Sequence, residues 1–87
     1  MKLWGKIIID NRIEKDMVVY FDEDKEYQEN LKISIIEICD KFDIEKPYWL
    51  PNNIKEFNQR GKTSFTKDNF IEVINYDKFI IEEIDQP

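Results

Sequence analysis

An amphipathic pattern over residues 25–43 is the feature that most constrains this fold. Apolar residues recur there at steps of four and three, the spacing that places side chains on one face of a helix. They are Tyr27, Leu31, Ile35, Ile38 and Phe42, with Ile36 and Cys39 widening the stripe. Asp22 and Asp24 precede it as N-cap candidates, and Pro47 prevents its continuation because proline disfavours helical geometry in the residue before it. We therefore expect one long helix that buries a single face.

The N-terminal region reads as a hairpin of two strands, residues 2–10 and 12–21, joined through "DNR". Its register stays open. A three-residue loop sets Ile9 opposite Ile13 and Leu3 near Val19, whereas a two-residue loop flips these pairings. Residues 17–21, "MVVYF", are apolar without alternation, which is typical of a strand covered on both faces.

A shorter helix is expected over about residues 52–60. Asn53 and Glu56 are spaced as an N-cap and its third residue, although Asn53 lies inside the helix if Pro51 is its first residue. Gly61 suits a left-handed helix end. We expect its buried edge to consist of Ile54 and Phe57.

The C-terminal third is less regular. In "FTKDNFIEVI" we favour a short helix capped by Thr66 that buries Phe70, Val73 and Ile74, with a strand as the alternative. Residues 77–84 read as a final strand. The predicted fold is a single α+β domain over residues 1–87: a small antiparallel sheet (the N-terminal hairpin plus the C-terminal strand) packed against two main helices and a short third helix.

Composition narrows the functional classes. The 87 residues carry a net charge of −6, one cysteine and no histidine. A single cysteine excludes an internal disulfide and fits a reducing cytoplasm. The first residues, "MKLWGKIIID", are too weakly apolar for a signal peptide, and no run approaches the roughly 20 apolar residues of a membrane helix.

No stretch of the sequence matches a known catalytic or cofactor-binding motif in full. Without histidine there is no histidine-based triad or zinc site. "GKTS" at 61–64 resembles the end of a phosphate-binding loop, but a glycine five residues earlier and a preceding strand are lacking. "DEDKE" at 22–26 lacks the glycine and glutamate of a calcium loop. Cys39, on an apolar face, is expected to be a buried and inert thiol. We therefore expect no cofactor, no metal and no enzymatic activity.

Several short stretches together resemble a known protein family. "LWGKII", "DNRI", "EIC", "KPYWL" and "FTKDNFIE", in this order, are similar to a family of small uncharacterised bacterial proteins. The resemblance would cover nearly the whole chain. It implies a shared fold and a bacterial origin, and it transfers no functional residue.

The segment 46–67 is basic within an acidic chain. Its five basic residues stand against Glu56 alone, a net of +4 that leaves −10 on the rest. Either it balances its acidic neighbours within the fold, or it presents positive charge to a partner. Between its prolines, Trp49 is expected to fill the core where the two helices meet and Tyr48 to stay partly exposed. The candidate interaction surface is Lys46, Tyr48, Lys55, Arg60, Lys62, Phe65 and Lys67.

These observations favour a non-enzymatic module that binds another protein. If the helices cover one side of the sheet only, Trp4, Ile8, Val18 and Tyr20 form an apolar patch on the other, and we expect a homodimer through it. Helices on both faces would remove that need. The alternative is a phosphate-ligand or nucleic-acid binder that uses segment 46–67, which the acidic remainder disfavours relative to an acidic protein partner. A third reading is that the acidic ends imitate nucleic acid.

Overall fold

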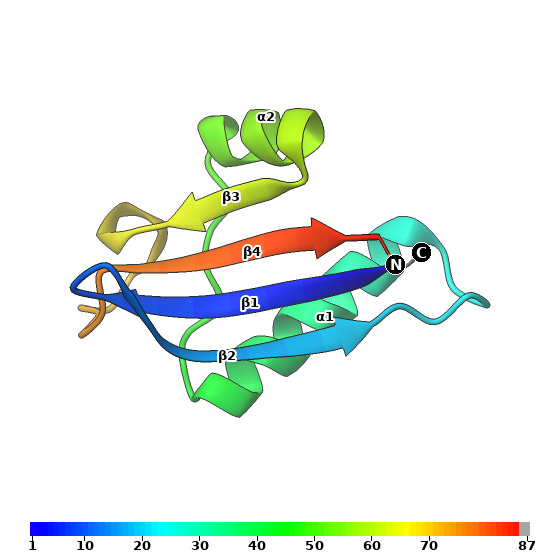
Figure 1. Ribbon diagram of the computed structural model, residues 1–87. Coiled ribbons are helices and arrows are strands. Elements are labelled where there is room, and N and C mark those ends of the chain that lie inside the picture. The colour runs from blue at the N-terminus through cyan, green and yellow to red at the C-terminus, as the bar shows by residue number, and fades with distance from the viewer. Residues whose placement is uncertain (86–87) are drawn as a thin grey trace.

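The fold combines a four-stranded antiparallel sheet with two helices. The computed structural model describes residues 1–85, and the sheet order is β2-β1-β4-β3. The elements are β1 (Lys2–Ile9), β2 (Arg12–Tyr20), α1 (Tyr27–Phe42), α2 (Pro51–Arg60), β3 (Lys62–Phe65), a 3-10 turn (Lys67–Asn69) and β4 (Lys78–Ile84). α1 crosses behind the sheet and α2 lies beyond the β3 edge (Figure 1). The predicted α+β arrangement is confirmed, and β3 is a strand that the sequence did not indicate.

A two-residue turn joins β1 to β2. Asp10 and Asn11 have φ values of 52° and 63°, the left-handed pair of a type I′ hairpin turn. This turn sets Ile9 opposite Arg12, but a bulge beside Ile7 and Ile8 then inserts one extra residue into β2. Beyond the bulge, Leu3 pairs with Val19, the pairing expected for a three-residue loop.

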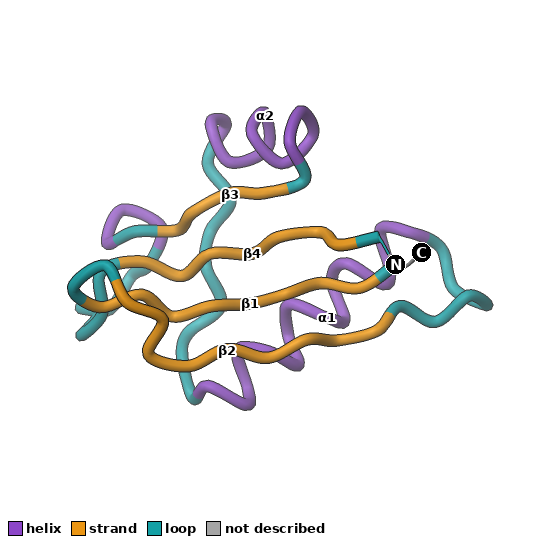
Figure 2. The backbone as a smooth tube through the Cα atoms, in the orientation of Figure 1, coloured by secondary structure: helices purple, strands orange, loops and turns teal. Residues whose placement is uncertain are grey.

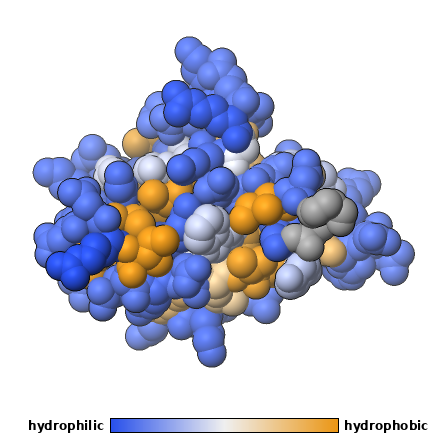
Figure 3. All heavy atoms as spheres, viewed as in Figure 1, coloured by the Kyte–Doolittle hydropathy of each residue, from blue (hydrophilic) through white to orange (hydrophobic). Residues whose placement is uncertain are grey.

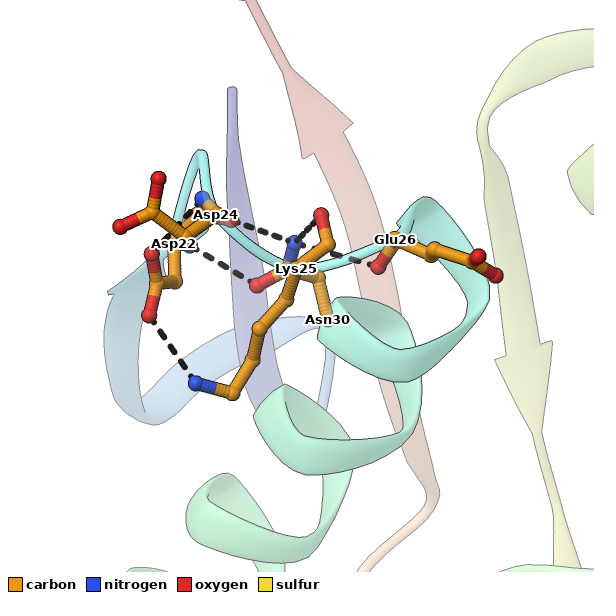
Figure 4. A network of polar contacts seen from close by, with 5 residues as sticks. All are labelled: Asp22, Asp24, Lys25, Glu26 and Asn30. Atoms are coloured by element: carbon orange, nitrogen blue, oxygen red, sulfur yellow. Dashed lines mark hydrogen bonds and ion pairs between the residues drawn. The ribbon is translucent and has the colours of Figure 1, made fainter.

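α1 begins without the predicted aspartate cap. Its N-cap is Glu26, which makes no side-chain capping bond, so the prediction for Asp22 and Asp24 is wrong. The buried amide of Asn30 organises this entry instead: it accepts the Asp22 N–H at 2.8 Å and donates to the Asp22 carbonyl at 2.8 Å (Figure 4). The Asp24 N–H, and then Lys25, lower the pKa of the Asp22 carboxyl. A carboxylate only accepts hydrogen bonds, whereas an amide also donates them, which suits this double role.

The core lies between α1 and the sheet. Leu3 and Ile7 of β1 meet the buried stripe of α1, in which Ile38 and Cys39 are fully covered. Gly5 permits the close approach, because a Cβ added there would lie 2.7 Å from Cγ2 of Ile38. Tyr27 is 41% exposed, so it lies at the edge of the stripe predicted for this helix.

α2 starts at Pro51, so Asn53 lies inside the helix. The Asn53 side-chain oxygen accepts the N–H of Leu50 at 3.1 Å and so caps the helix from its third position. Gly61 ends the helix with φ 67°, as expected. Phe57 is buried, but Ile54 is 49% exposed, so the prediction that Ile54 is buried is wrong.

The connector between the helices passes behind the strands (Figure 2) and places Trp49 against the core. Its ring lies 5.5 Å from that of Phe57 and 5.2 Å from that of Phe65, both edge-on. Trp49 therefore packs on the core as expected, but its side chain is only partly buried, and it meets α2 and β3 where a junction of the two helices was expected.

The short third helix is much shorter than predicted. Only Lys67–Asn69 form a 3-10 turn, because the Asn69 side chain accepts the Thr66 N–H at 2.9 Å and so closes the turn. Phe70 is buried as expected. Val73 is fully exposed, which contradicts the predicted helix face, and Ile74 is partly buried.

Candidate functional site

The face of the sheet turned away from α1 is the candidate site. Side chains alternate along each strand, so residues paired across the sheet share a face. Leu3, Gly5 and Ile7 face α1, and the even-numbered residues of β1 therefore face outward, together with their partners in the other strands. The space-filling view of this face shows apolar side chains gathered over the strands between charged neighbours (Figure 3).

An ordered polar and aromatic cluster lies at the centre of this open face. The indole Nε1 of Trp4 donates to the Asp16 carboxylate at 2.8 Å. The Trp4 ring lies over Lys6, whose Nζ is 3.8 Å from the ring centroid. Lys6 is only 7% exposed, and it forms an ion pair with Glu82 at 3.0 Å. Lys62 approaches the same carboxylate oxygen at 4.0 Å. The cluster thus spans all four strands.

Apolar side chains surround this cluster. Ile13, Val18 and Tyr20 of β2 are 51%, 36% and 67% exposed. The predicted grouping of Trp4, Ile8, Val18 and Tyr20 on one uncovered face is confirmed by the strand register. Ile8 itself is only 8% exposed, so β2 contributes most of the solvent-facing apolar surface. "MVVYF" is therefore covered on one face only, with Met17 and Val19 turned toward α1.

The open face differs in charge from the rest of the molecule. Lysines outnumber carboxylates on it, although the chain carries −6. The lysines are Lys2, Lys6, Lys62 and Lys78, and the carboxylates are Asp16 and Glu82, which gives a balance of +2 by the strand register. The excess acid therefore lies elsewhere, and residues 21–30 alone carry −4.

The basic segment does not form one patch. Lys62 lies at the edge of the open face, whereas Lys46 lies on the α1 side, 3.7 Å from Asp40. Exposed positions on α2 and in the 3-10 turn hold Lys55, Arg60 and Lys67, which make no ion pair within residues 1–85. Tyr48 is 55% exposed, as expected for that residue.

One residue of the predicted surface is in the wrong place. Phe65 is 0% exposed and packs against Trp49 and Phe79, so it belongs to the core and to no surface. The reason is β3 itself: as a strand, its alternation turns Thr63 and Phe65 inward while Lys62 and Ser64 face outward.

A buried amide network holds the basic segment together. Asn69 donates to the Asn53 side chain and to the Tyr48 carbonyl, both at 2.7 Å. Asn53 donates to the Thr63 hydroxyl at 2.8 Å, and that hydroxyl donates to Glu56 at 2.7 Å. The sequence analysis missed this network, because asparagines far apart along the chain carry no local signal of contact. These hydrogen bonds show that several polar residues of the segment stabilise the fold and are not free to bind a partner.

The chemistry available in the described residues is limited. Burial raises the pKa of the Cys39 thiol to about 11, which opposes thiolate formation. No group of three metal-ligating side chains occurs within residues 1–85. In the same part of the chain, neither helix is both long and apolar enough to cross a membrane.

Comparison with known proteins adds no relative. No family model, no curated protein and no solved structure matches this chain. The likeness to a bacterial family therefore stays a prediction, and function is argued from the geometry above.

Proposed function

We propose that this chain is a non-enzymatic protein-interaction module that forms a homodimer through the open face of its sheet. The observation that carries the proposal is an apolar and aromatic sheet face that neither helix within residues 1–85 covers (Figures 1 and 3). Three apolar side chains are exposed to solvent on this face: Ile13, Val18 and Tyr20. Contiguous apolar patches of this kind mark association sites.

Two such faces fit together by ordinary sheet packing. Stacked sheets lie about 10 Å apart with their strands within about 30° of each other. Four strands and an eight-residue β1 give a face of roughly 500 Å² in projection, from strand spacing and rise. A stable complex buries about 800 Å² on each partner, so we expect a dimer of micromolar rather than nanomolar affinity.

The charges of the face are compatible with a second copy as the occupant, although the balance of +2 on each face opposes stacking. Lys6 already pairs with Glu82 inside each copy, so stacking does not bury an unpaired lysine at the centre. Carboxylates and lysines share the face, so a two-fold axis can bring the lysines of one copy to the acids of the other. The acidic residues 21–30, with −4, lie outside the strands of the open face, so this charge is not stacked against another copy.

Sedimentation velocity over a concentration series tests the proposal. We expect the wild type to pass from monomer to dimer between micromolar and near-millimolar concentration, and Val18→Asp to remain monomeric. Val73→Asp is the matched control, because Val73 is fully exposed but follows the 3-10 turn, outside the open face. The proposal is contradicted if the wild type stays monomeric at every concentration, or if Val18→Asp and Val73→Asp weaken dimer formation equally.

The alternative of a phosphate or nucleic-acid binder has weaker support. Lys46 and Lys62 lie on opposite sides of the sheet, and each is already near a carboxylate. Binding through lysines and arginines weakens steeply as salt rises. Salt-dependent binding of a fluorescent single-stranded oligonucleotide that Arg60→Glu abolishes would favour this alternative over the homodimer.

A further inference from the structure

A second unfilled surface lies on the side of the sheet opposite the open face. It is an apolar groove of about 530 Å³ between α1 and α2, with Trp49 between them. The α1 side contributes Tyr27, Gln28, Leu31, Lys32, Ile35 and Ile36, and the other side Lys46, Trp49, Ile54, Phe57 and Asn58. No residue of the proposed dimer face lines it.

Several apolar side chains that border the groove are not fully buried in the core. Ile54 is 49% exposed although it stands beside the buried Phe57 on α2. Trp49 is partly buried and its ring meets that of Phe57 edge-on at 90°. Ile36 on α1 is also partly buried. Hydrophobic grooves on protein surfaces commonly bind the apolar face of an amphipathic helix.

The charged residues that line the groove are both basic. They are Lys32 and Lys46, and no carboxylate lines it within the described residues. Lys46 approaches Asp40 at 3.7 Å, but these side chains are 54% and 68% exposed, so the pair is weak and easily exchanged. Two lysines at the groove favour a negatively charged occupant locally, against the net charge of −6 on the chain.

We propose that the groove binds an amphipathic helical segment of a partner protein, with an apolar stripe flanked by aspartate or glutamate. The α1 wall from Gln28 to Ile36 spans about 12 Å at 1.5 Å per residue, enough for about two turns of a guest helix. The apolar stripe of the guest packs on Trp49 and Ile54, and its acids pair with the lysines at the rim.

The test is a titration of the isotope-labelled 87-residue chain with designed peptides. The probe is a capped peptide of about 15 residues, because shorter helices are marginal in water, with leucines along one stripe and glutamates beside it. Its matched control has lysine in place of every glutamate. We expect saturable shifts of the Trp49 indole N–H and the amides of Lys32 and Ile54 with the acidic peptide, and weaker binding of the basic one.

Variants separate the groove from the rest of the surface. Ile54→Asp and the double variant Lys32→Glu/Lys46→Glu should each weaken binding of the acidic peptide roughly tenfold, from lost apolar burial and lost charge pairing. Ile71→Asp and Lys41→Glu are the matched controls, since both positions are exposed and neither lines the groove. Both should bind as the wild type does.

Three results would overturn the proposal: no saturable shift with the acidic peptide, tighter binding of the basic peptide, or unchanged binding by Ile54→Asp. Val18→Asp keeps this test apart from the homodimer, because it should bind the peptide normally while it fails to self-associate. Loss of peptide binding in Val18→Asp, with the fold intact by circular dichroism, would place the peptide on the open face and also contradict the groove.

Discussion

Lys6 holds its ammonium nitrogen 3.8 Å from the centroid of the Trp4 ring and 3.0 Å from the Glu82 carboxylate. This arrangement lets a lysine lie almost buried on a sheet face that neither α1 nor α2 covers, because the ring shields the charge and the carboxylate neutralises it. The centre of the open face is therefore ordered before any partner arrives. A face whose side chains are already fixed loses less conformational entropy on association.

Removing the ring should destabilise the monomer. Trp4→Ala removes a large apolar contact and the cover over Lys6, and we expect the free energy of unfolding to fall by about 2 kcal/mol. Asp16→Asn keeps the ring and weakens only its hydrogen bond, so its cost should stay below about 1 kcal/mol. Urea denaturation followed by circular dichroism measures both, and equal effects would show that the ring itself contributes little.

The contact between β1 and α1 should not tolerate a methyl group at Gly5. A Cβ there would meet Cγ2 of the buried Ile38 at 2.7 Å, so Gly5→Ala should cost about 1–3 kcal/mol. In an Ile38→Ala background the same substitution should cost far less, because the clashing atoms are gone. A double-mutant cycle of denaturation experiments checks this, and additive effects would refute the clash.

The buried amide network should distinguish two adjacent asparagines. Asn53 is 1% exposed and bonds to Thr63, Ser64, Asn69 and Leu50, whereas Asn52 is exposed. Asn53→Ala should lower the free energy of unfolding by about 2–4 kcal/mol, since it leaves buried partners unsatisfied. Asn52→Ala should change it by less than about 0.5 kcal/mol. Similar losses in both variants would mean that the network is not formed.

Alkaline pH should reveal the burial of Cys39. Its pKa rises from 9.0 to about 11, so the native thiol keeps its proton where the unfolded thiol loses it. Stability from this group is complete below pH 9 and is lost as pH rises toward 11, by up to about 1.4 kcal/mol per pH unit. Burial also raises the pKa of Tyr76 to about 12. This group therefore adds a further loss of stability that begins near pH 10.0, where the tyrosine of the unfolded chain ionises.

Chemical denaturation at a series of pH values measures this loss. Cys39→Ala should start less stable, because it leaves a cavity, but its stability should fall less between pH 9 and 10 than that of the wild type. Parallel pH profiles for the two proteins would show that the thiol does not titrate differently in the folded and unfolded states.

Local patterns were sufficient to predict most of the fold. The stripe of α1, the hairpin residues and the left-handed Gly61 each depend on near neighbours, and each appears where the sequence indicates it. The register of the hairpin needed two features at once, a type I′ turn and a bulge, and the second leaves no clear mark in the sequence.

The errors over β3 and over the binding surface come from contacts between distant residues. Thr63 and Phe65 belong to β3 because Asn53 and β4 hold that short strand in place, and four residues carry too little periodicity to reveal it. The same strand buried Phe65, which sequence reasoning placed on a binding surface. The open face was predicted in outline, but the pairing of Lys6 with Glu82 joins residues 76 positions apart and had no local signal.

The most direct measurement of the homodimer is nuclear magnetic resonance of the labelled protein over a dilution series. Dimerisation through the open face predicts concentration-dependent shifts at Val18, Tyr20 and the Trp4 indole N–H, which vanish in Val18→Asp. It also predicts constant shifts for Ile71 and Val73, which lie after the 3-10 turn. Shifts that are constant everywhere up to near-millimolar concentration, or that map to α1 and α2 instead, would contradict it.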